Sequence, residues 1–224
     1  MRPAGGLADQ VWWLWVFVNA YNTPYLVAQS RGRSVLTQLL GSDFGGVLVS
    51  DCLAIYDDAT TLQQKCYAHH LKAIREAKAL HPHQGEGFLT ELSAMLRAAV
   101  ALQGHKAQCD PQSFQDLRQA LERKAVQLLD SPRSEPSEEA VRNRLQKQRD
   151  HLFTFLDHDG VEPTNNLAER QLRPAVIARK ISCGNKTPKG ARTWQILASL
   201  AATCAQRATS FIAELARAAP LQPR

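Results

Sequence analysis

The feature that most constrains the fold is a continuous apolar run near the start of the chain, Val11 to Val18 (VWWLWVFV). Its eight residues are fewer than half of the roughly 20 that a membrane-spanning helix needs, so the run predicts no membrane span. β-branched and aromatic residues dominate it, which favours a strand covered on both faces. The early Asp9 and the three tryptophans in the run argue against a signal peptide, so we expect a cytoplasmic protein without membrane contact.

The first 70 residues alternate strand and helix patterns. Asn22-Thr23-Pro24 forms a turn signal before a short strand at residues 25–28, so this strand and the apolar run predict a hairpin. A short helix at residues 30–40 is expected to stop at Gly41. Residues 47–50 then read as a strand that ends at Asp51, and a further short strand is expected around residues 64–67. A carboxylate at the carboxyl end of a buried strand is where open α/β sheets place their chemistry.

The middle of the chain has helical periodicity. We expect helices at residues 71–80, 88–102, 114–129 and 138–156, and Asp110-Pro111 supplies a cap and a first-turn proline for the third of them. We therefore predict three parts: an α/β part at 1–70, a helical insertion at 71–158 and a final helical part at 159–224. An apolar stripe in the final part predicts core packing, with a helix break at Thr209-Ser210; its members are Trp194, Leu197, Ala201, Cys204, Ala208, Phe211 and Leu215.

Positive charge is concentrated at the C-terminal end. Residues 162–224 carry 10 Lys and Arg against 3 Asp and Glu, whereas residues 1–61 carry 3 against 5. The formal net charge of the chain is +6. This asymmetry suggests a polyanionic partner, with nucleic acid as the first candidate.

The segment from Gly160 to Arg192 gathers polar groups at one helix end. Thr164 or Asn165 can cap a helix that places Glu169 about one turn in, and Pro174 is expected to end or kink that helix. The cations of this segment are Arg170, Arg173, Arg179, Lys180, Lys186, Lys189 and Arg192. One interpretation is a loop and helix that follow a phosphate backbone. The alternative is a solvated helix in which Glu169 pairs with an arginine.

This segment resembles the C-terminal part of the insertion sequence 66 (IS66) family of bacterial transposases. The resemblance rests on an Asn-Asn pair, then Ala-Glu-Arg, Leu-Arg-Pro and an Arg-Lys pair; here these are Asn165, Asn166, Ala168, Glu169, Arg170, Leu172, Arg173, Pro174, Arg179 and Lys180. Upstream, the tryptophan-rich run, Asp51 followed by Tyr56, and Cys66-Tyr67-Ala68-His69 are similar to further elements of the family.

The resemblance implies an α/β, RNase H-like fold and a DDE-type transposase, in which three carboxylates hold two Mg²⁺ (or Mn²⁺) ions during DNA strand cleavage and transfer. It implies that Asp51 is the second and Glu169 the third of these ligands. The cations of the 160–192 segment would position phosphates of the transposon ends. The resemblance also implies a homo-oligomer in a transposition complex.

The likeness departs from the family at the first catalytic aspartate, which lies on a strand before the tryptophan-rich strand. Asp9 is the one early carboxylate, and we interpret it, with Gly5-Gly6, as a hairpin turn and not as a metal ligand. We therefore expect a partial core that lacks its first strand, leaves strand edges unpaired, and is poorly stable or rearranged. This predicts an impaired transposase domain; the alternative is a non-catalytic DNA-binding or oligomerising remnant that modulates a full-length transposase.

Five cysteines without a CxxC pair predict reduced thiols. Cys66 and His69 have the spacing of zinc ligands, but zinc sites usually need four ligands. We interpret the pair as local packing, with His70, His81 and His83 as alternatives that could complete a metal site.

Overall fold

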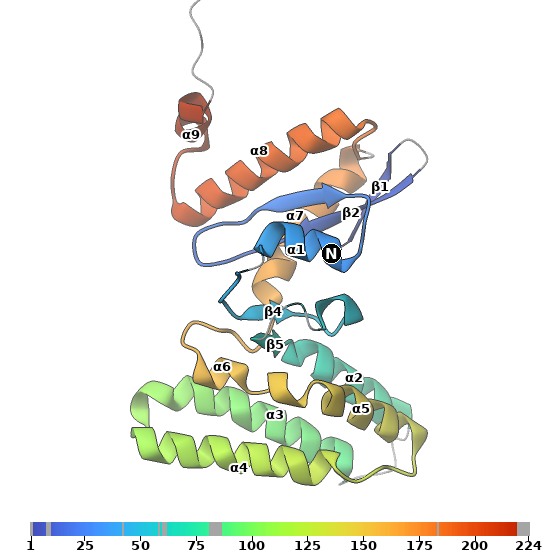
Figure 1. The fold of residues 1–224 in the computed structure, drawn as a ribbon, viewed down its shortest axis with the longest axis vertical. Helices are drawn as coiled ribbons and strands as arrows, with labels where there is room; N and C mark the ends of the chain where they lie inside the picture. Colours follow the sequence, from blue (N-terminus) through green and yellow to red (C-terminus); the bar gives the residue numbers. More distant parts are fainter. Residues whose placement is uncertain are drawn as a thin grey trace, which may run out of the picture. The chain divides into compact units, whose positions relative to one another are not determined.

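The computed structural model describes residues 2–7, 10–41, 43–57, 59, 62–80, 87–182 and 184–218, with side chains from residue 11 onward. The chain divides into two compact units (Figure 1). Met1–Ser42 and Asn166–Arg224 form the discontinuous unit, and Asp43–Asn165 forms the helical unit. Our three-part division stays a prediction.

The discontinuous unit contains an antiparallel sheet of three strands in the order β1-β2-β3: β1 (Arg2–Leu7), β2 (Gln10–Val16) and β3 (Tyr25–Ala28). The predicted hairpin is confirmed, with Val16 opposite Tyr25. The side chain of Asn19 accepts the N–H groups of Tyr21 and Asn22, both at 2.8 Å, and so shapes the connection between β2 and β3. Leu14 and Trp15 are neighbours on opposite faces of β2, and both are buried, as the apolar run predicts.

β1 corrects one expectation. Gly5 and Gly6 were expected in a turn, but they lie in β1, opposite Trp12 and Val11, with an irregularity in the register between Pro3 and Gly5. β2 is consequently paired along both edges, although we expected one of its edges to lack a partner. Without side chains at two positions, the glycine pair can pack its backbone closely against the tryptophan-rich strand. Asp9 lies outside the described residues.

α8 (Pro188–Arg207) covers the free edge of β3 with three polar side chains. Gln195 Oε1 accepts the N–H of Val27 at 2.9 Å, Ser199 Oγ that of Tyr25 at 2.8 Å, and Thr203 Oγ1 that of Thr23 at 3.1 Å. Four helical residues rise about 6 Å and two strand residues about 6.6 Å, so a polar residue at every fourth position meets every second N–H of the strand. Figure 1 shows α8 (Pro188–Arg207) running alongside the sheet.

α7 (Asn166–Ser182) continues through Pro174, so the expectation that the helix ends there is wrong, and a kink at this position stays a prediction. Proline removes one hydrogen bond from a helix, but packing can hold both sides in place. Leu172 and Ala175 flank Pro174 and are buried with Leu14 and Tyr25, and the Tyr25 hydroxyl donates to the carbonyl of Gln171 at 2.5 Å. The remaining helices of the unit are α1 (Arg33–Leu40) and α9 (Phe211–Ala218), and residues 208–210 separate α9 from α8 as predicted.

The helical unit holds a second, parallel sheet formed by β4 (Leu48–Ser50) and β5 (Gln63–Lys65). The predicted strand that ends just before Asp51 is confirmed. Its helices are α2 (Tyr67–Leu80), α3 (Phe88–His105), α4 (Pro111–Leu129), α5 (Pro136–Lys147) and α6 (Thr154–Asp157). The described part of this unit also has the 3₁₀ turns η1 (Ala54–Tyr56), η2 (Lys106–Gln108) and η3 (Arg149–His151). Among the described residues, no helix combines the length and hydrophobicity needed to cross a bilayer.

Most helix predictions in this unit are confirmed, and Asp110 caps α4 by accepting the N–H of Ser113 at 3.0 Å. The single helix expected at residues 138–156 is wrong, because α5 ends at Lys147 and a 3₁₀ turn precedes α6. Four apolar side chains in this stretch, Leu152, Phe153, Phe155 and Leu156, are all buried in one core. Thr154 between them is buried as well, and a regular helix would spread five consecutive residues around its whole circumference, so the chain turns to bury them.

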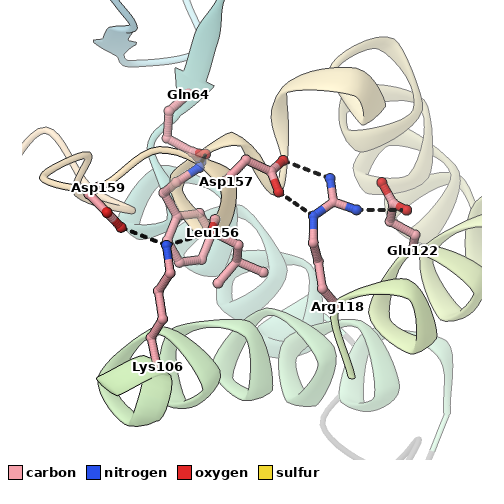
Figure 2. Close-up of polar contacts among 8 residues, drawn as sticks. Gln64, Lys106, Arg118, Glu122, Leu156, Asp157 and Asp159 are labelled. Atoms are coloured by element: carbon pink, nitrogen blue, oxygen red, sulfur yellow. Dashed lines mark hydrogen bonds and ion pairs between the residues drawn. The ribbon is translucent and has the colours of Figure 1, made fainter. Parts of the chain in front are cut away.

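A polar network fixes residues 155–160, which lead toward the Asn-Asn pair (Figure 2). Arg118 on α4 binds both carboxylate oxygens of Asp157, at 2.5 and 2.7 Å, and also Glu122 at 2.9 Å. Lys106 binds Asp159 at 2.6 Å and the carbonyl of Leu156 at 3.3 Å. The fully buried Gln64 of β5 accepts the N–H of Phe155 at 3.0 Å, so the strand and this turn are held together.

Candidate functional site

Asp51 directly follows β4, at the carboxyl end of the parallel pair. Its side chain is half-buried, and Oδ1 accepts the N–H of Leu53 at 3.1 Å. This local turn orients the carboxylate at the end of the strand. The position is the one that sequence reasoning expected for a metal-binding aspartate, and the role of Asp51 stays a prediction.

A buried ammonium group lies in the strand beside Asp51, and sequence reasoning missed it. Lys65 is opposite Ser50 in the sheet, its side chain is 1% exposed, and Nζ is 3.5 Å from Asp57 Oδ1. Burial lowers the pKa of Lys65, against the opposing effect of Asp57. Burial also acts to raise the pKa of Asp57, but Lys147, at 2.6 Å, and Lys65 together lower it. The signal in the sequence was a lysine in a short predicted strand, preceded by Gln64 and followed by Cys66.

Thiols that follow β4 and β5 and imidazoles of α2 lie near this ion pair. Cys52 Sγ lies 3.7 Å from His70 Nε2, and burial lowers the pKa of His70 to about 3, so its ring is neutral. Burial acts to raise the pKa of Cys66, but its hydrogen bonds with His69 and Asn165 together outweigh this and lower it. The N–H of Asn165 also points to Cys66 Sγ, at 3.4 Å.

This cluster does not complete the zinc site that the Cys66 and His69 spacing left open. Within the described ranges, no three His, Cys, Asp or Glu side chains are grouped so that they could hold a metal ion. His81 and His83 lie outside those ranges. Cys66 and His69 are a contact pair at the start of α2.

Glu169 lies in the first turn of α7, where the helix dipole favours an acidic side chain, and it is exposed. Along the same helix Arg170, Arg173 and Lys180 are exposed, and Arg179 is half-buried. Lys186, Lys189 and Arg192 are exposed before and within the first turns of α8. The discontinuous unit therefore contains Glu169 and all seven predicted DNA-binding cations.

The basic stretch is free of acidic residues over a long distance. No Asp or Glu occurs from Arg170 to Ala213, whereas eight Lys and Arg residues do: the seven predicted cations and Arg207. Asp51 belongs to the helical unit and Glu169 to the discontinuous unit. Each carboxylate is placed within its own unit, and their joint action on a cation stays a prediction.

Part of the apolar stripe on α8 lines an open hollow, which corrects the expectation that the whole stripe is core. Cys204 is buried, but Leu197 is 38% exposed. The hollow has a volume of about 710 Å³, and its lining includes Lys189, Thr193, Trp194, Leu197, Ala201 and Phe211. Trp194 also packs against Tyr25, with ring centroids 5.7 Å apart.

Comparison with known proteins places this arrangement in context. The profile of a family described as "Transposase IS66 family" matches residues 2–193. A protein of Sinorhizobium fredii with the name "Uncharacterized protein y4qI" is 23% identical over 237 residues, which cover 91% of this chain and 42% of that protein. The chain thus spans less than half the length of this relative. No solved structure matches the chain.

Proposed function

The chain belongs to the IS66 family of transposases, and from this premise we propose that it supplies DNA strand cleavage and transfer at the ends of an insertion sequence. The basic stretch on α7 and α8 would hold the phosphate backbone of the transposon ends. Asp51 and Glu169 would act at the scissile phosphate. The observation that carries the proposal is the run from Arg170 to Ala213, in which exposed cations follow one another without an acidic residue.

The phosphate-binding role follows from the position and exposure of the cations. Six of the seven predicted contact residues are exposed; they are Arg170, Arg173, Lys180, Lys186, Lys189 and Arg192. The stretch also includes the N-terminus of α8, which Thr187 caps by accepting the N–H of Gly190 at 3.1 Å. A helix N-terminus adds partial positive charge. Lys and Arg side chains that neutralise phosphates supply affinity that does not depend on base sequence.

Asp51 and Glu169 have the donor type that Mg²⁺ or Mn²⁺ requires, since hard cations bind oxygen ligands. Asp51 fits such a ligand because it is half-buried and already oriented by Leu53. Neither unit forms a complete metal site by itself, because the described residues of neither unit bring three candidate metal ligands together. When bound, a divalent ion would stabilise the attacking and leaving oxygens of the phosphodiester.

We further propose that the chain has an RNase H-like core. Supporting this is the parallel pairing of β4 with β5, which leaves Asp51 at the carboxyl end of a strand. In open α/β sheets this is the end at which ligands bind.

The test is to incubate the purified chain with Mg²⁺ or Mn²⁺ and duplex DNA that carries the inverted repeats flanking its gene. We expect nicking or strand joining that Asp51→Asn and Glu169→Gln each abolish. Asp116→Asn on α4 and Glu76→Gln on α2 are matched controls, because both residues are exposed in the helical unit. Activity that survives the double substitution of Asp51 and Glu169 would remove the carboxylate mechanism.

A second candidate is a non-catalytic DNA-binding partner that modulates a longer transposase. It is favoured by the fact that the basic helices lie within one unit, whereas the two carboxylates belong to different units. DNA binding at transposon ends with no cleavage under either metal ion would select this function. Cleavage that depends on Asp51 and Glu169 would exclude it.

A further inference from the structure

The hollow on α8 is built from features that suit flat apolar groups. Its lining combines small residues, among them Ala198 and Ala201, with the larger side chains of Trp194, Leu197 and Phe211. Its volume, about 710 Å³, is within the range of pockets that hold small ligands. Trp194 and Phe211 are both half-buried, so each retains exposed ring surface.

The charge around the hollow restricts what can occupy it. Lys189 contributes to its lining, and Lys186 and Arg192 lie within three residues of Lys189 and are exposed. No acidic residue occurs anywhere in α8. A second copy that docked through the same face would bring the same cations to this surface and be repelled. The hollow therefore complements an anionic partner that also carries flat apolar groups.

We propose that this hollow binds unpaired bases of single-stranded DNA, which stack on Trp194 and Phe211 while Lys186, Lys189 and Arg192 hold the flanking phosphates. This inference rests on the proposed DNA function and deepens it by naming the form of DNA. Stacking requires an exposed base face, which a paired and stacked duplex does not offer. A basic groove combined with aromatic platforms is the general solution for binding single strands without sequence preference.

Tryptophan fluorescence gives a direct readout, because Trp194 is the one tryptophan outside β2. The probes are an oligonucleotide of about 15 deoxythymidines, the length of a single-strand binding site, and a duplex of equal length. We expect the single strand to quench the emission of Trp194. The Trp194→Phe variant lacks this emission, so its fluorescence should not respond to the single strand. The duplex binds through the cations and leaves this emission unchanged.

The affinities of variants for single-stranded and duplex DNA distinguish base stacking from electrostatic attraction to phosphates. We expect Trp194→Ala to weaken single-strand binding roughly 5- to 100-fold, the effect of removing one stacking platform, and to leave duplex binding unchanged. Trp194 also packs on Tyr25, so Trp194→Ala could weaken binding by destabilising the fold. A second variant that keeps Trp194 separates the two effects. Ala201→Phe fills the hollow from an exposed position and should weaken single-strand binding similarly, whereas Ala205→Phe, exposed on the same helix outside the lining, should not.

Three results would overturn the inference. Duplex binding with no effect of Ala201→Phe on single strands would remove the hollow as the site and leave the proposed function standing. Quenching by poly-glutamate as strong as that by DNA would assign the hollow to an acidic peptide. Failure of both DNA forms to bind would overturn the proposed function as well.

Discussion

Single residues around β5 show how the helical unit tolerates buried polar groups. Lys65 and Gln64 are adjacent, and both side chains are fully buried. Gln64 satisfies its amide by donating to the carbonyls of Lys65 and Leu152 and by accepting the N–H of Phe155. Lys65 relies on Asp57. His70 avoids the cost of burial differently, because it remains neutral.

The burial of His70 predicts a loss of stability in acid. The unfolded chain protonates His70 below its ordinary pKa of 6.5, but burial in the folded chain lowers the pKa to about 3. The stability that depends on neutral His70 is therefore complete above pH 6.5 and is lost as the pH falls toward 3, by up to about 1.4 kcal/mol per pH unit. We expect His70→Leu to flatten the dependence of the free energy of unfolding on pH between 6.5 and 4, measured by urea unfolding. Parallel curves for the two proteins would contradict this.

The Lys65 and Asp57 pair predicts a strongly non-additive effect on stability. Asp57→Asn leaves the buried ammonium without its carboxylate, so we expect the free energy of unfolding to fall by about 3 kcal/mol. Adding Lys65→Met, which removes the buried charge, should restore most of that loss. Denaturant unfolding of the two single variants and the double variant tests the coupling. Additive losses would mean that the two side chains do not stabilise each other.

At the scale of elements, the contact between α8 and β3 explains why the sheet can end at β3. An edge strand presents unpaired N–H groups that recruit other strands. Here the side chains of Gln195, Ser199 and Thr203 accept three of them. The helix therefore both packs apolar residues on the sheet and completes its hydrogen bonding.

Ser199 is the residue with which to test this contact. Ser199→Ala leaves the N–H of Tyr25 without its acceptor, and an unsatisfied buried donor costs about 1 to 3 kcal/mol. We expect the free energy of unfolding to fall by about that amount. Ser34→Ala, at an exposed position of α1, should change it by less than about 0.5 kcal/mol. Equal effects of the two substitutions would refute the role of Ser199.

Local patterns predicted the elements well where a single signal dominated, as in the β2–β3 hairpin and the Asp110 cap of α4. They failed where packing overrode the local preference. Pro174 is accommodated because its flanking residues are buried, and the helix after Lys147 breaks because Leu152 to Leu156 must all reach the core. The four-residue spacing of Gln195, Ser199 and Thr203 was visible in the sequence. It predicts hydrogen bonds to a strand only when the helix is known to lie along a strand edge.

For the candidate site, sequence reasoning named Asp51 at a strand end and Glu169 in the first turn of a helix, and the structure gives both that local setting. It interpreted Trp194 and Leu197 as core, because an apolar stripe does not reveal whether a neighbour covers it. It also missed Lys65, since burial of a charged residue depends on a partner, Asp57, eight positions away.

At the scale of the whole molecule, the segregation of charge predicts how DNA binding responds to salt. We expect duplex affinity to fall steeply with salt concentration, and the triple substitution of Lys186, Lys189 and Arg192 by Gln to reduce the log–log slope by up to about 3. The matched control replaces Lys72, Arg75 and Arg97, exposed cations of the helical unit, and should leave the slope unchanged. Equal slopes for all three proteins would exclude these residues as phosphate contacts.

The discontinuous unit joins residues that the ribosome makes far apart in time. Thr23 and Thr203, which meet across the edge of β3, are separated by 180 positions. At about 5 to 20 residues per second, the hairpin emerges roughly ten to forty seconds before its covering helix is synthesised. During synthesis the β2–β3 hairpin therefore exposes apolar side chains and an unpaired strand edge, both of which favour aggregation. We expect a chaperone that binds the hairpin until α8 has been synthesised to raise the yield of native protein.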